Sequence, residues 1–315
     1  MLDSNLWRKL GAVTLAWLAT AGQAQMTPET AEKIRALGRV VNPPATAPIY
    51  APRVLESEPY MGVNVQRDVK YGDNERHLLD VFTPQAASAT PRPVFVFVHG
   101  GGFVRGDRRG PGSPFYDTLM LWAVRNGMIG VNMTYRLAPK DVWPAGAQDV
   151  GLAIRWVSEQ IGSRGGDPKK VFLMGHSAGA AHVASYVADE RFHQVQGAGL
   201  AGALMLSGLY RISPELTAQE EPVRLYFGAD AATYGERSAQ GGLLKTKVPL
   251  WVGYGELNPP SFVAQSEGLK DALCAANRCP AFKIFPGHSH MSEIYSIHTD
   301  DKQVSDAMLA FVKAN

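Results

Sequence analysis

The chain has 315 residues, of which 45% are hydrophobic and 19% are charged, so it is long enough to bury one large core or two smaller ones. Its formal net charge is only +2, and it lacks the strongly basic balance typical of proteins that bind nucleic acids or acidic membranes. Glycine and proline are common but form no low-complexity tract, and no repeat of fixed period is present.

The first residues have the pattern of an export signal. A short basic region precedes an apolar run at residues 10–21, which is too short to span a bilayer. The small residues of Gly22-Gln23-Ala24 then occupy the positions that a signal peptidase requires. We predict a signal peptide over residues 1–24, cleaved after Ala24. The mature chain would have no membrane span and would be periplasmic or secreted; the alternative is an uncleaved N-terminal anchor.

The next segment, residues 25–62, differs from the remainder of the chain. Much of it is polar and interrupted by prolines, and one stretch at 30–37 has a helical pattern. We expect an N-terminal extension, or part of a cap, that packs over the core. Residues 63–315 form the second unit, which begins with two strands at 63–69 and 78–82 joined by a polar turn.

Later strands are continuous apolar runs, typical of strands buried on both faces. Helical segments separate most of them, and residues 145–161 place four apolar side chains on one helical face. This alternation predicts an α/β fold with a mostly parallel sheet covered on both sides. Residues 209–247 interrupt the alternation, and we expect a cap insertion there. The runs lie at 94–98, 128–135, 171–174, 202–208, 249–255 and 282–287.

A glycine-rich loop, "HGGGF" at residues 99–103, directly follows the strand at 94–98. Glycines leave backbone N–H groups open to a ligand, and such donors stabilise the oxyanion of a tetrahedral intermediate. We assign the N–H groups of Gly101 and Gly102 to this role, together with that of Ala178. A phosphate-binding loop is the alternative, but the Lys-Ser/Thr ending of such loops is missing.

Ser177 lies at the centre of "GHSAG", between an apolar strand and a helix of small residues. A nucleophile elbow has this pattern, because the serine adopts a strained backbone and the flanking glycines remove Cβ atoms that would collide with the turn. We predict Ser177 as a nucleophile. The alternative is an idle serine in a glycine-rich bend.

A serine nucleophile needs a histidine base and a group that orients the histidine. In the chain order of this type of site the orienting acid precedes the histidine. His290 is the favoured base and His288 the alternative. Glu256 is the favoured acid. Asn258, which orients without a charge, or another carboxylate would be the alternative, although the change from Asp to Asn in a serine protease lowers turnover about 10⁴-fold.

Two cysteines, Cys274 and Cys279, lie close together near the C-terminal end of the chain. In an oxidising compartment such a pair is expected to form a disulfide that closes a small loop. Two buried thiols are the alternative. Zinc is not expected, because no second cysteine pair or histidine pair lies at ligand spacing.

The segments "HGGGF", "YRLAP" (135–139), "WPAGAQD" (143–149) and "GHSAGA" resemble the hormone-sensitive-lipase-like branch of the α/β-hydrolases. The segments "PPSFVAQS" and "HSHMS" also resemble kynurenine-formamidase-like and feruloyl-esterase-like secreted hydrolases. The resemblance extends from about residue 63 to the C-terminus. It implies an eight-stranded sheet, a serine hydrolase and a broad range of carboxylester substrates.

We therefore expect a carboxylester hydrolase that acts on short to medium acyl or aryl esters through Ser177, His290 and Glu256. Its partner would be a small-molecule ester, and the mechanism needs no metal or cofactor. An arylformamidase, or a non-catalytic binding protein with a hydrolase fold, is the alternative. The chain would be a monomer or a homodimer.

Overall fold

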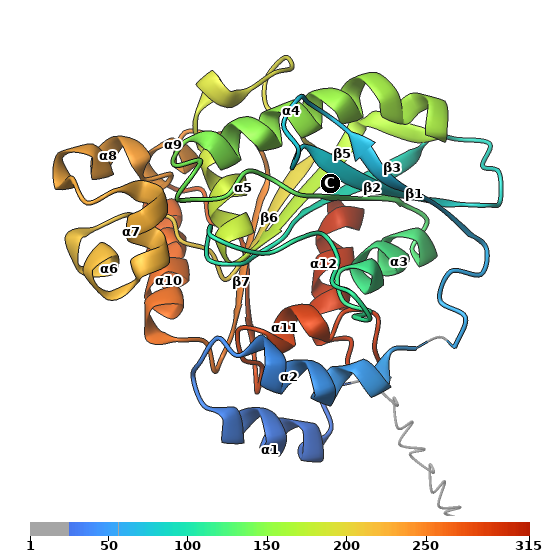
Figure 1. Cartoon of the computed structure of the whole chain (residues 1–315), viewed down its shortest axis with the longest axis horizontal. Helices are drawn as coiled ribbons and strands as arrows, with labels where there is room; N and C mark the ends of the chain where they lie inside the picture. Colours follow the sequence, from blue (N-terminus) through green and yellow to red (C-terminus); the bar gives the residue numbers. More distant parts are fainter. Residues whose placement is uncertain (1–24, 56) are drawn as a thin grey trace, which may run out of the picture.

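The computed structural model describes residues 25–55 and 57–315 (Figure 1). The predicted signal peptide, residues 1–24, lies outside the described residues. None of the helices in the described part of the chain combines the length and the apolar character that crossing a membrane requires.

An eight-stranded sheet forms the centre of the molecule, in the order β1-β2-β4-β3-β5-β6-β7-β8. β1 pairs antiparallel with β2, and β2 pairs antiparallel with β4; all the other pairs are parallel. The predicted mostly parallel sheet is confirmed, and each predicted strand segment corresponds to one of these strands. The strands are β1 (Val63–Lys70), β2 (Leu78–Pro84), β3 (Arg92–Val98), β4 (Ile129–Met133), β5 (Gly166–His176), β6 (Gly202–Leu206), β7 (Leu250–Gly255) and β8 (Ala281–Phe285).

Side chains of β3 alternate between two apolar cores, one on each face of the sheet. Val94, Val96 and Val98 contact the first core, while Phe95 and Phe97 contact the second. Each fully buried side chain of this size contributes about 1.5–3 kcal/mol. The continuous apolar pattern of the strand therefore follows from helices that cover both faces.

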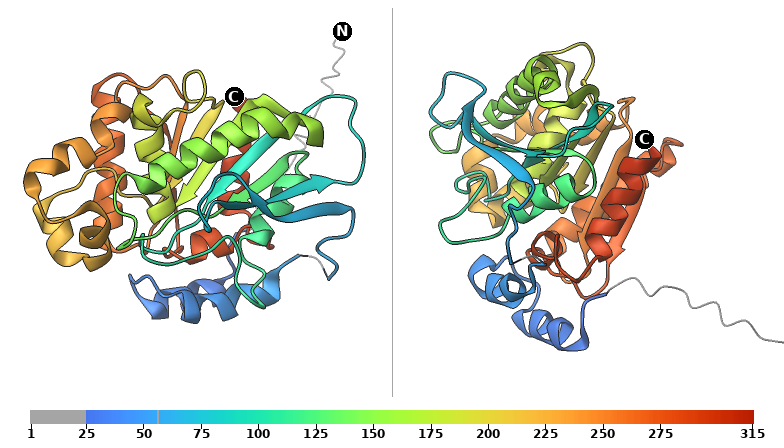
Figure 2. Two further views of the ribbon diagram at one scale, coloured as in Figure 1. Left: turned by 45° about the horizontal axis from the view of Figure 1, so that its top comes forward. Right: turned by 90° about the vertical axis from the view of Figure 1, so that its right-hand side faces the viewer.

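The helices divide between the two faces of the sheet (Figures 1 and 2). The first core is covered by α4 (Ala145–Gln160), α5 (Ala178–Ala188), α9 (Gln240–Leu243) and α10 (Pro260–Ala275). The second core is covered by α3 (Asp117–Arg125), α11 (Ser292–Tyr295) and α12 (Gln303–Ala314), with side chains from the N-terminal helices. Short 3-10 turns complete the chain at η1 (Ala51–Arg53), η2 (Ile161–Arg164), η3 (Glu190–Phe192) and η4 (Ala231–Thr233).

The segment that interrupts the alternation, residues 209–247, is helical in the structure. It contains α6 (Pro214–Gln219), α7 (Glu221–Phe227), α8 (Tyr234–Arg237) and the short α9. The first three lie together at one end of the sheet, coloured gold to orange in Figure 1. Their apolar side chains form a third core with Phe103 and Ala178, so the segment packs directly against the glycine-rich loop and the start of α5.

The N-terminal extension forms α1 (Pro28–Leu37) and α2 (Pro43–Tyr50). Both helices begin with proline behind a side-chain cap, because proline is tolerated where the first N–H groups have no intrahelical acceptor. Tyr50 donates a hydrogen bond to Asp301 at 3.2 Å, and Arg39 donates one to the main-chain oxygen of Asn258 at 3.4 Å. In Figure 1, α2 lies beside α11, and α1 packs against the side of α2 that faces away from α11.

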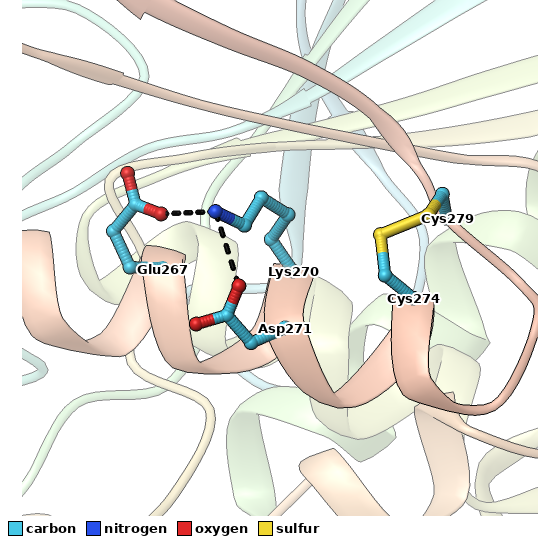
Figure 3. The surroundings of a disulfide bond; sticks show 5 residues. All are labelled: Glu267, Lys270, Asp271, Cys274 and Cys279. Atoms are coloured by element: carbon cyan, nitrogen blue, oxygen red, sulfur yellow. Dashed lines mark hydrogen bonds and ion pairs between the residues drawn. A yellow bond between two sulfur atoms is a disulfide. The ribbon is translucent and has the colours of Figure 1, made fainter.

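Figure 3 shows the pair Cys274 and Cys279, which is disulfide-bonded as predicted. The bridge joins the end of α10 to the chain just before β8. Near it on α10, Lys270 forms ion pairs with Glu267 and Asp271. Both sulfurs are used in the bridge, so neither cysteine is available as a thiol ligand.

Candidate active site

Ser177 lies on the turn between β5 and α5 and has a positive φ, which is strained for a residue with a side chain; φ is 58° and ψ is −124°. The turn is held because the N–H of Ser177 donates to the main-chain oxygen of Leu206 on β6 at 3.0 Å. A Cβ atom on Gly175 would lie 2.4 Å from the carbonyl group of Gly179, and one on Gly179 would lie 2.1 Å from the oxygen of Val98. Only glycine fits at these two positions, as expected for a nucleophile elbow.

The glycine-rich loop passes directly beside the elbow. Gly101 has a φ of 130°, and a Cβ atom there would lie 2.0 Å from the main-chain oxygen of Arg105. Within the described residues, the N–H groups of Gly101, Gly102 and Ala178 donate no hydrogen bond to another part of the chain. All three residues line one cavity together with Ser177, so the arrangement leaves unpaired donors beside the serine.

That cavity has a volume of about 490 Å³ and lies at the C-terminal ends of the parallel strands. Its walls are largely apolar. Apart from the elbow, they come from the N-terminal extension, the glycine-rich loop, Tyr116 before α3, the segment 209–247, the start of α10 and the region of α11. The apolar lining residues away from the elbow are Val40, Val41, Pro43, Phe103, Leu209, Leu216, Pro222, Val223, Pro259, Phe262 and Met291. Arg105 and Glu220 are the charged lining residues.

His290 follows β8, is fully buried and lines this cavity. Its ring packs against Phe262 and His176, with ring centroids 4.3 and 4.7 Å apart. Burial, with a smaller electrostatic contribution from the neighbouring His176, lowers the pKa of His290 well below its ordinary value. The ring is therefore held neutral at neutral pH, as a general base must be.

Asn258 is the residue that contacts the Nδ1 atom of His290, through Oδ1 at 2.6 Å. The orientation of the amide is fixed, because Nδ2 donates to the oxygen of Gly255 at 3.0 Å and to Oε2 of Glu293 at 3.1 Å. An oxygen therefore faces Nδ1 of His290, so Nδ1 must carry the hydrogen. The lone pair is then on Nε2, which has no hydrogen-bond partner among the described residues.

Glu256, the residue predicted to orient the histidine, is placed elsewhere. Its side chain is exposed, and Oε2 accepts a hydrogen bond from the N–H of Gly287 at 2.8 Å. The turn between Gly255 and Asn258 reverses the chain, so Asn258 points inward while Glu256 points to solvent. The contact expected of Glu256 is thus made by Asn258.

The alternative base, His288, is also buried but does not line the cavity. Its Nδ1 atom lies 3.2 Å from the hydroxyl of Ser292, and its Nε2 atom lies 3.3 Å from Asp301. These contacts join the loop after β8 to the start of α11 and to the chain after α11. The contacts of His288 therefore connect parts of the structure, whereas His290 lines the same cavity as Ser177.

Glu293 is the site residue that sequence reasoning missed. It lies on the short helix α11 and is completely buried. Besides Asn258, Oε2 accepts from the N–H of Gly255, and Oε1 lies 3.3 Å from Nε2 of His176. The only available signal was its position three residues after His290, where one helical turn can return a side chain toward the histidine.

One group of ligand-type side chains in the described part of the chain has a spacing suited to a metal ion. It consists of His176, His290 and Glu293, whose ligand atoms lie within 4.8 Å of one another. Two of these side chains already make hydrogen bonds there: His176 to the oxygen of His290, and Glu293 to Asn258. An ion bound by this group would compete with the serine for His290.

The chain is similar to known proteins in sequence and in fold. Residues 63–210 match the family described as the carboxylesterase family. Esterase LipC of Mycobacterium tuberculosis is 37% identical over 36% of this chain and 27% of its own length. The gibberellin receptor GID1 of Oryza sativa subsp. japonica is 33% identical over 50% of this chain and 45% of its own length. The chain thus spans less than half the length of these curated relatives.

A solved structure with the same architecture is Esterase B from Lactobacillus rhamnosis. Its TM-score is 0.70 at 18% identity, and the superposition covers 91% of this chain and 95% of that chain. This likeness establishes the α/β-hydrolase fold. Together with the family match, it confirms the resemblance to α/β-hydrolase esterases that the motifs indicated.

Proposed function

We propose that this α/β-hydrolase is a serine carboxylester hydrolase, with Ser177 as the nucleophile and His290 as the general base. The single observation that carries the proposal is one cavity lined by the strained serine, by the buried histidine and by glycine N–H groups that have no partner in the described part of the chain. Acyl transfer needs these three elements together: a nucleophile, a base and an oxyanion site.

The reaction would proceed in two steps. Nε2 of His290 takes the proton of the Ser177 hydroxyl as Oγ of the serine attacks the carbonyl carbon of the ester. The electrons of the C=O double bond then move onto the carbonyl oxygen, which becomes the oxyanion. The tetrahedral intermediate collapses, the C–O bond to the alcohol breaks, and His290 gives its proton to the leaving oxygen. Water then attacks the acyl-enzyme in the same way, which releases the acid and restores the serine.

The oxyanion would be bound by the N–H groups of Gly101, Gly102 and Ala178. These groups are free to donate because no carbonyl of the described chain accepts from them. Removing one donor of this kind from a hydrolase costs roughly 3 kcal/mol in transition-state stabilisation. The left-handed backbone at the glycines makes this arrangement possible.

Asn258, in place of the expected Glu256, would orient the base. A serine protease loses about 10⁴ in turnover when its aspartate becomes asparagine, because the amide selects the wrong tautomer. In this protein the amide is fixed the other way round, with Oδ1 toward His290. A neutral residue then supports the productive tautomer.

The cavity supports esters of short to medium length as substrates. A volume of about 490 Å³ with mostly apolar walls suits a small acyl or aryl group. We further propose that residues 25–62 and 209–247 act together as a cap, because side chains from both line the cavity. The proteins compared above are named esterases and a receptor, and they lend no support to an arylformamidase.

We also propose that the mature protein begins after Ala24 and is periplasmic or secreted. The disulfide between Cys274 and Cys279 supports an oxidising compartment. N-terminal sequencing of the protein recovered from its native cell fractions tests this proposal. A mature N-terminus at Gln25 is the expected result, and an intact N-terminus in the cytoplasm would contradict it.

The experiment that tests the function is hydrolysis of p-nitrophenyl acetate and butyrate, combined with labelling by a fluorophosphonate. We expect the wild-type chain to hydrolyse both esters and to be labelled at Ser177, and Ser177→Ala to lose both properties. A receptor-like binding protein would bind small molecules but would fail both assays in its wild-type form. Activity that persists in Ser177→Ala would place the nucleophile elsewhere.

A further inference from the structure

The buried carboxylate of Glu293 contacts Asn258, the residue that contacts His290. Glu293 is completely inaccessible to solvent, and Oε2 accepts hydrogen bonds from Nδ2 of Asn258 at 3.1 Å and from the N–H of Gly255. A chain of contacts thus leads from His290 through the amide of Asn258 to a carboxylate. Burial of a carboxylate is costly unless it is paired and hydrogen-bonded, so its position needs an explanation.

The amide of Asn258 has two orientations that fill the same space. With Oδ1 toward His290, Nδ1 of the histidine carries the hydrogen and Nε2 is free to take the serine proton. With Nδ2 toward His290, Nδ1 must accept, the hydrogen moves to Nε2, and the base is lost. Which orientation prevails depends on the groups around Nδ2.

Those groups are both acceptors. Nδ2 faces the oxygen of Gly255 at 3.0 Å and Oε2 of Glu293 at 3.1 Å. A flipped amide would place Oδ1 next to these two oxygens. The negatively charged Oε2 of Glu293 would then repel Oδ1 directly. A hydrogen bond to an ionised acceptor is about twice as strong as one between neutral groups, so Glu293 makes the larger contribution.

We infer that Glu293 is a positioning residue that acts through Asn258: it fixes the amide so that His290 keeps its hydrogen on Nδ1. This inference rests on the proposed function, because it assumes that His290 is the base. During turnover His290 becomes positively charged, and a buried carboxylate one amide away would stabilise that charge. The site would then consist of Ser177, His290, Asn258 and Glu293. In a site with an acid next to the histidine the carboxylate contacts the ring directly, whereas here the amide of Asn258 lies between the ring and the carboxylate.

The rival explanation is purely structural. Glu293 also holds the N–H of Gly255 and lies 3.3 Å from Nε2 of His176, so it joins β7, β5 and α11. If it only joined these elements, its loss would lower stability and activity irrespective of the residue at position 258. The two explanations therefore differ in whether the effects of positions 293 and 258 on turnover are coupled.

A double-mutant cycle separates them. We expect Glu293→Gln, which keeps the shape and removes the charge, to lower kcat on p-nitrophenyl acetate by roughly 10- to 100-fold, as for outer partners of functional histidines, with little change in KM. In an Asn258→Ala background the same change should alter kcat by less than about 2-fold, because the residue that transmits its effect is gone. Independent, multiplying effects would overturn the inference.

Asp301→Asn is the matched control. Asp301 is equally buried, but it contacts His288 and Tyr50 and not Asn258. Its effect on kcat should multiply with that of Asn258→Ala. Coupling of Asp301 to Asn258 as strong as that of Glu293 would show that any buried carboxylate has this effect, and would overturn the inference.

A second measurement does not depend on activity. Nitrogen NMR of the wild-type protein labelled at histidine should show His290 as the tautomer with hydrogen on Nδ1, and proton NMR should show a low-field signal for that hydrogen. In folded Glu293→Gln this signal should move or disappear through exchange with water. Hydrogen on Nε2 in the wild type, or an unchanged signal in the variant, would overturn the inference.

Failure of the proposed function would look different. In that case the wild-type chain would hydrolyse no ester and Ser177 would not react with a fluorophosphonate, whatever residue occupied position 293. The NMR result would still decide how Glu293 and Asn258 hold His290. An active wild type with uncoupled positions 258 and 293 would overturn only the inference about Glu293.

Discussion

His176 donates a hydrogen bond from Nε2 to the main-chain oxygen of His290 at 2.9 Å. The residue immediately before the proposed nucleophile thus holds the residue proposed as base. A carbonyl oxygen can only accept, so the hydrogen of the His176 ring is assigned to Nε2. The contact links the end of β5 to the loop after β8, which are separated by β6 and β7 in the sheet.

We therefore predict that His176→Phe lowers kcat by roughly 10-fold or more, because a misplacement of about 1 Å is enough for a large loss in turnover. The variant also leaves a buried carbonyl oxygen unpaired, which costs about 1–3 kcal/mol of unfolding free energy. Steady-state kinetics and urea unfolding measure the two effects separately. Unchanged kcat in a destabilised variant would show that the contact serves stability only.

The neighbouring residues Glu256 and Asn258 should differ sharply in their effect on activity. Glu256→Gln keeps an oxygen that can accept from the N–H of Gly287 and removes a charge from an exposed side chain, so we expect kcat/KM to change by less than about 3-fold. Asn258→Ala removes the partner of His290 Nδ1 and should lower kcat by roughly 10²-fold or more. Ester hydrolysis by the two purified variants tests this pair, and a larger loss in Glu256→Gln would restore the sequence-based assignment.

The choice between these two residues shows where sequence patterns reach their limit. The elbow, the glycine-rich loop and all the strands follow from local patterns, because glycine requirements and buried apolar runs are properties of short segments. The partner of the histidine depends on which way a turn directs its side chains. The Gly255–Asn258 turn points Asn258 inward and Glu256 outward, and no composition rule distinguishes them.

Glu293 and α2 were missed for related reasons. Glu293 reaches Asn258 only because α11 begins just after His290 and turns the chain back toward β7. The helix α2 contains Pro48 and two prolines at its start, a composition that favours extended chain when it is considered alone. Packing of Tyr50 against the second core, and its contact with Asp301, stabilise the helix from outside its own sequence.

The pH dependence of activity should follow His290. Its pKa is lowered well below the ordinary value of 6.5 by burial and by the neighbouring His176, so the free base persists into acid. We predict that kcat/KM for p-nitrophenyl butyrate stays constant from neutral pH down to below 6.5 and falls only at lower pH. An acidic limb centred at or above 6.5 would contradict the buried position of the base.

Stability should decline over a related range of pH. Burial lowers the pKa of His99 to about 4 and of His182 to about 3, and that of His290 is also lowered. In the unfolded chain these histidines have a pKa of about 6.5, so below this pH the unfolded chain binds protons that the folded chain does not bind. The free energy of unfolding therefore has its full value above about pH 6.5 and decreases as the pH falls toward the lower pKa values of the folded state. Urea unfolding in a pH series tests the direction, and greater stability at pH values under 6.5 would contradict it.

The disulfide should matter for stability and not for chemistry. Cys274 and Cys279 are five positions apart and do not line the cavity. Closing so short a loop contributes roughly 2 kcal/mol by the chain-entropy relation. We expect the double variant Cys274→Ser/Cys279→Ser to unfold at a lower temperature with kcat/KM within about 2-fold of the wild type, and a large loss of activity at a temperature where the variant is folded would contradict this separation.

The apolar walls of the cavity predict how substrate length can be changed. Val223 on α7 lines the cavity and is buried in the third core beside Phe103. Val223→Phe would add several heavy atoms to a volume of about 490 Å³ and should exclude the longer acyl chain first. We expect kcat/KM for p-nitrophenyl butyrate to fall at least about 10-fold relative to acetate, since each methylene in an apolar pocket is worth ~1–3 kcal/mol. The control is Val142→Phe, at an exposed position outside the cavity, where the ratio of the two esters should not change. An equal loss on both esters in Val223→Phe would mean that this wall does not contact the acyl chain.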